Sequence, residues 1–161
     1  MKKSLILLLG SNEGDRMNNL DKARLLLHTN LGEVQLASSV YRTKAWGKTD
    51  QADFLNQVVV IPYAGKATDA LATMLTIERK LGRERNEKWG PRTIDIDMLY
   101  FGNEIYKSPE LTVPHPALHI RRFTLVPLVE IMPEFIHPVF NKSQLQLLHA
   151  CTDNLEVRKV N

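Results

Sequence analysis

The sequence predicts an α+β fold in which helices cover an antiparallel sheet. The chain has 161 residues, 43% hydrophobic and 24% charged, which are the proportions of one ordinary globular domain. Short runs rich in leucine and valine alternate with two longer stretches whose apolar residues recur at helical spacing. The resulting order, β-α-β-β-α-β, is the ferredoxin-like arrangement. We expect a single domain over residues 1–161, with a C-terminal helical and hairpin extension on the same core.

The first half of this core begins with a buried strand at Leu5–Gly10. Asp15 can then accept a backbone hydrogen bond as the N-cap of a helix that ends at Gly32. The apolar residues on one face of that helix are Leu20, Ala23, Leu27 and Leu31. Two further strands are predicted at Val34–Thr43 and Phe54–Tyr63. The long polar connection between them, Lys44–Asp53, is typical of a functional loop.

A second helix is predicted from an N-cap at Thr68 to Gly82, with one inward face: Leu71, Met74, Leu75 and Leu81. The fourth strand, Thr93–Phe101, completes the core. A Pro/His turn follows, and then an apolar helix around Phe123–Ile131. Ser143 and Gln146 have the spacing of a capping box, which predicts a last helix. Cys151, the only cysteine, is expected to pack in that C-terminal helix as a small hydrophobe.

Composition excludes several function classes. The net charge is +3 and the pI is about 9.0, a balance that favours an anionic ligand but is too weak to indicate a duplex-DNA binder. The N-terminal apolar run, Leu5–Leu9, is shorter than the core of a signal peptide. No window approaches the length of a membrane span. We therefore expect a cytoplasmic protein with no membrane partner.

Asp95 and Asp97 are the sharpest local signal. Strand residues alternate between faces, so these two carboxylates project together, separated by about 6.6–6.8 Å of strand rise. Like charges on one face repel unless a cation lies between them, and Mg²⁺ binds well to one or two carboxylates plus phosphate oxygens. From the spacing alone, a solvated outer face remains an equal alternative.

The basic segment Arg83–Arg92 comes directly before this strand. It carries four cations against two acids, and arginine forks bind phosphate oxygens bidentately. Flanking glycines and Pro91 predict a loop that could close over a ligand. Taken alone, the segment would be better explained as a solvated surface loop. Beside two metal-binding carboxylates, it instead fits phosphoryl transfer.

Two phosphate-binding patterns are rejected. Gly47-Lys48-Thr49 matches the end of a P-loop, but Arg42 stands where the first glycine belongs. The chain has no G-x-G-x-x-G sequence, so a Rossmann dinucleotide site has no support. His115, in a rigid Pro-His-Pro turn, could reach a phosphate, although a structural role would be the default reading.

A series of motifs occurs in order along the chain. They are Gly10-Ser11-Asn12, Asp50-Gln51-x-x-Phe54-Leu55-Asn56, Gly82-Arg83-x-Arg85, Trp89-Gly90-Pro91-Arg92-x-Ile94-Asp95-Ile96-Asp97, Leu111-x-Val113-Pro114-His115-Pro116, Arg121-x-Phe123 and Pro127-Leu128-x-Glu130-Ile131. Together they resemble the 6-hydroxymethyl-7,8-dihydropterin pyrophosphokinase (HPPK) family of folate biosynthesis. The resemblance covers roughly residues 5–150 and is highly specific as an ordered set.

The resemblance implies diphosphokinase activity, with ATP as co-substrate and release of AMP. It implies two Mg²⁺ ions held by Asp95 and Asp97. The catalytic residues that it implies are Arg83, Arg92 and Asp97. The ATP-binding residues are Glu78, Arg83, Arg85, Trp89, Arg92, Thr112, His115 and Arg121. Those for the pterin are Thr43, Trp46, Phe54, Asn56, Asp95 and Phe123, where Phe54 and Phe123 would sandwich the ring; without the resemblance, core packing would be preferred for both.

Three positions depart from the family pattern: Ala45, Lys88 and Leu75. They bear on nucleotide affinity and on loop behaviour rather than on the reaction.

A rival from another class is a nucleic-acid-binding module on the same scaffold, but Asp95 and Asp97 would repel a nucleic-acid backbone. A non-catalytic relative is disfavoured by the retained motifs. We expect small-molecule substrates, no nucleic acid and a monomer.

Overall fold

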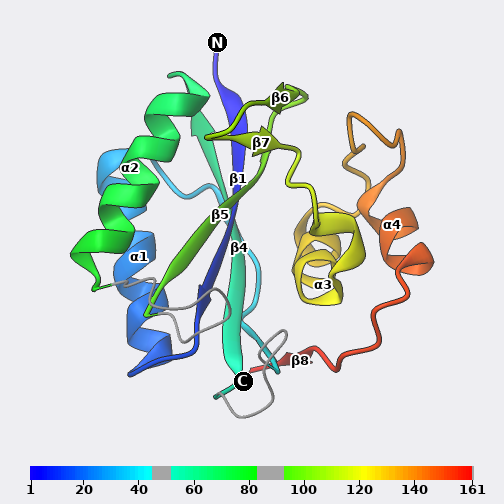
Figure 1. Cartoon of the computed structure of the whole chain (residues 1–161), viewed down its shortest axis with the longest axis horizontal. Helices are drawn as coiled ribbons and strands as arrows, with labels where there is room; N and C mark the ends of the chain where they lie inside the picture. The colour runs from blue at the N-terminus through cyan, green and yellow to red at the C-terminus, as the bar shows by residue number, and fades with distance from the viewer. Residues whose placement is uncertain (45–51, 83–92, 161) are drawn as a thin grey trace.

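The computed structural model describes residues 1–44, 52–82 and 93–160. Its helices and strands, in chain order (Figure 1), are β1 (Lys3–Ser11), α1 (Arg16–Asn30), β2 (Leu36–Ala37), β3 (Tyr41–Thr43), β4 (Phe54–Tyr63), α2 (Ala67–Lys80), β5 (Asp95–Phe101), β6 (Tyr106–Lys107), β7 (Thr112–Val113), the 3₁₀ helix η1 (Leu118–Ile120), α3 (Arg122–Ile131), α4 (Gln144–Ala150) and β8 (Arg158–Lys159).

The main sheet has the strand order β5-β1-β4-β3-β8, with β2 also paired to β4. All of these pairings are antiparallel. Helices α1 and α2 cover one face, and α3 and α4 lie on the other (Figure 1). β6 and β7 form a separate two-stranded hairpin. The predicted antiparallel ferredoxin-like core, with its helical and hairpin extension, is confirmed.

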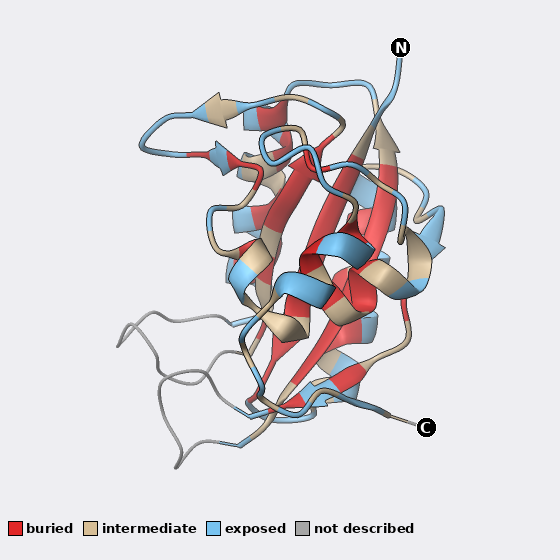
Figure 2. Cartoon of the chain, turned by 90° about the vertical axis from the view of Figure 1, so that its right-hand side faces the viewer, coloured by how far each residue is buried: buried red, intermediate tan, exposed pale blue. Residues whose placement is uncertain are grey.

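The sheet separates two hydrophobic clusters, and Figure 2 shows that its central strands are largely buried. Leu5, Leu7 and Leu9 of β1 belong to the cluster under α1 and α2. Ile6 and Leu8 belong to the cluster under α3 and α4. Because β1 is paired on both edges and covered on both faces, a strand in this place must be apolar throughout.

The prediction of one continuous strand over Val34–Thr43 was wrong. It divides into β2 and β3, and Ser38 lies in the gap between them. There Ser38 N–H donates to Val58 O, while Ser38 Oγ accepts from Val58 N–H, and both bonds are 2.8–2.9 Å long. A side chain that takes over a backbone partner interrupts the ladder at this point.

The start and inward face of α2 also differ from the prediction. The helix begins at Ala67, and its N-cap is Lys66 rather than Thr68, with no side-chain hydrogen bond at the cap. Its buried residues are Ala67, Ala70, Met74, Ile77 and Glu78. Leu75 was placed on the inward face in error, since it is 38% exposed. The buried face of α2 instead includes the carboxylate of Glu78, which the hydrophobic pattern had not included.

Several other local predictions are confirmed. Asp15 caps α1 by accepting from Asn18 N–H, and Ser143 and Gln146 form the reciprocal capping box of α4. The fourth strand begins at Asp95, two residues later than expected. Cys151 lies just after α4, as its C-cap, rather than within the helix as expected, and it packs partly buried against the second cluster. Among the described residues, no helix has the length and apolar character needed to cross a membrane.

Candidate active site

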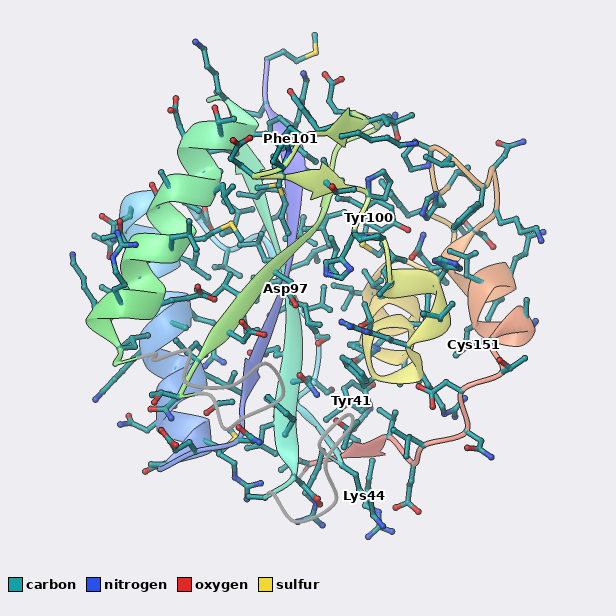
Figure 3. The ribbon with its side chains drawn as sticks, viewed as in Figure 1. Tyr41, Lys44, Asp97, Tyr100, Phe101 and Cys151 are labelled. Atoms are coloured by element: carbon teal, nitrogen blue, oxygen red, sulfur yellow. The ribbon has the colours of Figure 1, made fainter. Side chains whose placement is uncertain are left out.

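Asp95 and Asp97 lie on the α3 side of the edge strand β5. Asp97 pairs with Leu8 of β1, whose side chain belongs to the cluster under α3. Ile94, Ile96 and Met98 instead belong to the cluster under α1 and α2. The pairing of β1 with β5 shifts only beyond Met98, so the bulge leaves the two carboxylates on one face. Both are half-buried, and Figure 3 shows Asp97 part-way along β5.

Asn56 and Asp95 flank the same glycine. Gly10 of β1 pairs with Asn56 of β4 on one side and with Asp95 of β5 on the other. Directly paired residues project to the same face, so the amide and the carboxylate share the α3 side of the sheet. A methyl group at Gly10 would come within 2.8 Å of Asn56 Oδ1 and 3.6 Å of Phe54 Cδ1. Glycine therefore leaves room for both side chains.

Thr43 fixes the orientation of Asn56. The Asn56 side-chain N–H donates to Thr43 Oγ1 over 3.0 Å, and both residues are 3% exposed. Because the amide nitrogen is taken by the hydroxyl, the carbonyl oxygen Oδ1 faces Gly10. Phe54, two residues before Asn56 on β4, projects to the same face. Three of the residues expected to bind the pterin thus form one surface.

His115 joins this surface from the turn after β7. Its backbone N–H donates to Leu99 O, and its Nδ1 accepts from Ala117 N–H, so the proton of the neutral ring is on Nε2. Burial, and after it the charge of Arg121, lower the pKa of His115 to about 4, although the charge of Asp95 acts in the opposite direction. At neutral pH the ring is therefore an uncharged donor beside Arg121 and Asp95.

The first turn of α3 brings Arg121 and Phe123 to the same side of the sheet. Arg121 is the N-cap residue of α3. Its guanidinium carbon lies 5.6 Å from the centre of the Phe123 ring, which is cation–π range. Phe123 is partly buried against the second cluster.

Two of the residues expected to bind ATP, Glu78 and Thr112, do not join the surface formed by Asn56, Asp95, His115 and Arg121. Glu78 is 3% exposed, and its Oε2 accepts from Ile96 N–H over 2.7 Å. This bond holds the backbone of β5 between the two aspartates, which sequence analysis had not foreseen. Thr112 is exposed on β7. Trp46, Arg83, Arg85, Trp89 and Arg92 lie outside the described residues, as does most of the Lys44–Asp53 loop.

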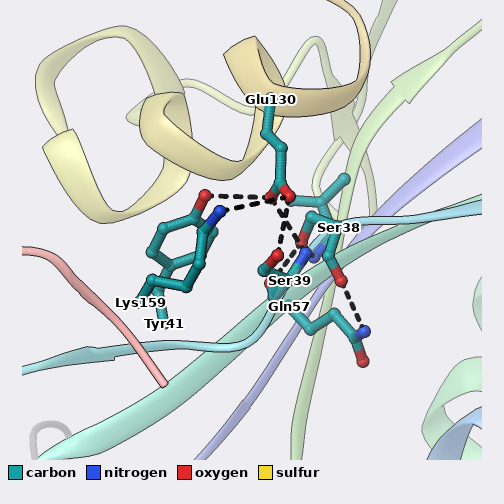
Figure 4. Close-up of polar contacts among 7 residues, drawn as sticks. Ser38, Ser39, Tyr41, Gln57, Glu130 and Lys159 are labelled. Atoms are coloured by element: carbon teal, nitrogen blue, oxygen red, sulfur yellow. Dashed lines mark hydrogen bonds and ion pairs between the residues drawn. The ribbon is translucent and has the colours of Figure 1, made fainter. Parts of the chain in front are cut away.

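A polar cluster around Glu130 connects α3 to the strands (Figure 4). Glu130 Oε1 accepts from Ser39 N–H and from the Tyr41 hydroxyl, and Oε2 accepts from Ser39 Oγ, over 2.7–2.9 Å. Lys159 Nζ lies 4.0 Å from Oε2. Glu130 appeared in one of the sequence motifs, but nothing in the sequence alone indicated these partners.

Burial and hydrogen bonding act in opposite directions on Glu130. Burial raises the pKa of its carboxyl, but the hydrogen bonds from Ser39 and Tyr41 and the charge of Lys159 outweigh burial and lower the pKa overall. Burial, followed by the hydrogen bond and the charge of Glu130, raises the pKa of Tyr41 to about 12. The carboxylate is therefore ionised and the phenol neutral at physiological pH.

Comparison with known proteins identifies the family. The family model described as 7,8-dihydro-6-hydroxymethylpterin-pyrophosphokinase (HPPK) matches residues 6–133. The chain belongs to the HPPK family. A Synechocystis sp. protein named 2-amino-4-hydroxy-6-hydroxymethyldihydropteridine pyrophosphokinase is 41% identical over 147 residues, which cover 89% of this chain and 75% of the relative. A relative of the same name from Aquifex aeolicus is 42% identical, covering 83% of each chain.

Solved structures agree with this assignment at the level of the fold. A Plasmodium falciparum HPPK-DHPS chain superimposes with a TM-score of 0.75 at 19% identity. The match covers 93% of this chain and 44% of that chain, so this chain spans less than half of the Plasmodium protein. The resemblance in sequence, with its ordered motifs, therefore led to the right family.

Proposed function

We propose that this chain performs the reaction of its family at the surface formed by Asn56, Gly10, Asp95 and Asp97. A diphosphate group would pass from ATP to the hydroxymethyl oxygen of 6-hydroxymethyl-7,8-dihydropterin, with release of AMP. The observation that carries the proposal is the sharing of one face by a pair of carboxylates and an amide held by Thr43. The first suits a metal-bound triphosphate, and the second suits the polar edge of a pterin.

The donor set of β5 fits Mg²⁺. Asp95 and Asp97 supply hard oxygen ligands, and Mg²⁺ completes its shell with water and phosphate oxygens rather than with a protein cage. The described residues contain no group of three or more metal-binding side chains, which suits a metal that arrives with a nucleotide. We propose two ions here. Bound Mg²⁺ would neutralise phosphate charge and polarise the transferring group.

The pterin would lie between Phe54 and Phe123. Both side chains are half-buried and belong to the α3 side of the sheet. A flat heteroaromatic ring gains from stacking on such rings beyond the area that it buries. Asn56 Oδ1 is then the acceptor for the amino edge of the ring, because its amide nitrogen is already bonded to Thr43.

The transfer needs positioning and charge balance more than covalent chemistry. The bond from the hydroxymethyl oxygen to the β-phosphorus of ATP forms while the bond from that phosphorus to the oxygen that bridges the α- and β-phosphates breaks. AMP leaves with the bridging oxygen, and the hydroxyl proton passes to a carboxylate or to water. His115 donates from Nε2 without adding charge, and Arg121 supplies a cation. In this proposal Arg83 and Arg92 balance the phosphate charge, and Glu78, Thr112, Arg85, Trp89 and Trp46 complete the substrate contacts.

The proposal is tested by incubating the protein with ATP, Mg²⁺ and the pterin and identifying the nucleotide product. AMP is expected, and the Asp97→Asn variant should form it at least about 100-fold more slowly, because charge stabilisation of the transition state is lost. Asp21→Asn, at an exposed site on α1, is the matched control. ADP as the product, or wild-type rates in Asp97→Asn, would contradict the assignment.

The predicted domain extent, oligomeric state, localisation and partners are part of the same proposal. One domain over residues 1–161, acting as a monomer in the cytoplasm, would carry the whole reaction with small molecules as its only partners. Salt-dependent binding of RNA together with no AMP formation would instead favour the nucleic-acid-binding alternative.

A further inference from the structure

The C-terminal tail, residues 151–160, leaves α4, passes α3 and reaches β3 (Figure 1). Along the first part of the tail, partly buried residues alternate with exposed ones, and the inward set is Cys151, Asp153, Leu155 and Val157. The tail begins against the cluster under α3 and ends with Val160 packed against the cluster under α1 and α2. It lies beyond residues 6–133, which the family model matches.

The tail contacts α3 at its N-terminus. Asp153 Oδ2 accepts from Arg122 N–H over 2.9 Å. The N-cap residue of α3, Arg121, makes no side-chain cap hydrogen bond, so this carboxylate supplies the acceptor that the helix lacks. Asp153 Oδ1 also accepts from Leu155 N–H over 3.1 Å, which orients the carboxylate. A negative charge at this position also complements the helix dipole.

The tail contacts β3 at its other end. β8 pairs with β3 through Lys159 opposite Tyr41 and Arg158 opposite Arg42. Val160 N–H adds a hydrogen bond to Val40 O over 2.8 Å. The Lys159 ammonium lies 4.0 Å from Glu130 Oε2, so the same residue that pairs with β3 also approaches the far end of α3.

We propose that this tail fixes α3 relative to β3 and thereby maintains the pterin side of the site, with Asp153 as a positioning residue. The inference rests on the proposed function. Phe123 lies in the first turn of α3, directly after the amide that Asp153 holds. Thr43, which orients Asn56, ends the strand that β8 borders. The tail thus holds α3, which presents the Phe123 ring, together with β3, which carries the threonine that orients Asn56, although none of the tail's residues need touch a substrate.

The test compares Asp153→Ala with Asp153→Asn in the full-length protein. Asp153→Ala removes both acceptors, and we expect KM for the pterin to rise about fivefold, the factor that corresponds to the loss of one helix cap. KM for ATP and kcat should change less than about twofold, because η1 also holds Arg121 through its N–H bond to Leu118 O. Asp153→Asn keeps an acceptor and should restore most of the pterin affinity.

Three further measurements separate the possible outcomes. Glu156→Ala removes an exposed acid of the same tail, 69% exposed, and should leave both KM values unchanged. A chain ending at Glu156 keeps Asp153 but lacks β8, and its KM for the pterin should also rise. Hydrogen exchange at the Arg122 and Phe123 amides should quicken in Asp153→Ala, and this readout does not depend on activity.

The proposal would be overturned if KM for the pterin were unchanged in both Asp153→Ala and the chain ending at Glu156. It would also be overturned if KM for the pterin and KM for ATP rose equally. If the wild-type protein formed no AMP, the proposed function would fail instead. In that case, hydrogen exchange at the Arg122 and Phe123 amides would still test the role of the tail. Exchange as slow in Asp153→Ala as in the wild type would contradict the proposal that Asp153 stabilises the start of α3.

Discussion

Asn56 and Asp95 lie two strands apart on one face of the sheet, with Gly10 paired between them. Adjacent strands are about 4.8 Å apart, which places the two backbones roughly 10 Å from each other. The space above Gly10 is thus bounded by an amide on one side and a carboxylate on the other. This spacing separates the proposed pterin edge from the proposed metal site by the width of one strand.

Substitution of Gly10 should test that space directly. In Gly10→Ala the new methyl group would lie 2.8 Å from Asn56 Oδ1, so the amide must turn away and its hydrogen bond to Thr43 must weaken. We expect KM for the pterin to rise by about tenfold, the equivalent of one lost hydrogen bond of about 1.4 kcal/mol. Steady-state kinetics measure this change, and circular dichroism should show an intact fold. An unaltered pterin KM would argue against this placement of Asn56.

Removal of the Phe123 ring should weaken pterin binding without abolishing turnover. An aromatic stacking contact contributes about 0.5–1.5 kcal/mol, so Phe123→Ala should raise KM for the pterin by about two- to tenfold. Calorimetric titration of the pterin gives the same comparison at equilibrium. Phe140→Ala is the control, since Phe140 is 41% exposed and stacks on His137 rather than on a residue of the proposed pterin site. Equal losses in the two variants would remove Phe123 from the pterin site.

Stability should fall on mild acidification because His115 is buried as a neutral ring. Burial, aided by Arg121, lowers its pKa to about 4 from 6.5. Between these values the unfolded chain binds the proton and the folded chain does not, so protonation favours unfolding and stability decreases as the pH falls. His115 contributes a slope of up to about 1.4 kcal/mol per pH unit in this window.

Urea unfolding at several pH values between about 4 and 7 checks that slope. His115→Gln should make it shallower, whereas His28→Gln, at an exposed position of α1, should leave it unchanged. His137, whose pKa is also lowered to about 4 by burial and then by His119, continues to contribute in both variants. An equally steep slope in His115→Gln would contradict the prediction.

Neutralising Glu130 should destabilise the packing of α3 on β3. Glu130→Gln keeps the shape but weakens the charge-assisted bonds from Ser39 and Tyr41, and we expect unfolding to become easier by about 1–2 kcal/mol at pH 7. The pKa of Glu130 is lowered in the folded chain, so its stabilisation is present above its unfolded pKa and is lost as the pH falls through the folded value. Denaturant unfolding of the two proteins should therefore converge at low pH.

Local sequence signals predicted the positions that depend on neighbouring residues alone. The caps at Asp15 and Ser143 form within one helical turn. The common face of Asp95 and Asp97 follows from strand alternation, which the bulge beyond Met98 does not disturb. These features were predictable because their geometry is set by the backbone period. The start of α2 and the exposure of Leu75 were not, since tertiary burial overrides propensity there.

By itself, the sequence determined the β-α-β-β-α-β order of the core, the carboxylate pair and, through its motifs, the HPPK family. Only the tertiary structure decided which distant residues meet: Glu78 on the backbone of Ile96, Glu130 on Ser39 and Tyr41, and Asp153 at the start of α3. Each of these is a carboxylate that satisfies backbone or hydroxyl donors far away in the chain. Such pairings leave no periodic trace in the sequence, because they depend on how the elements pack and not on the spacing within any one of them.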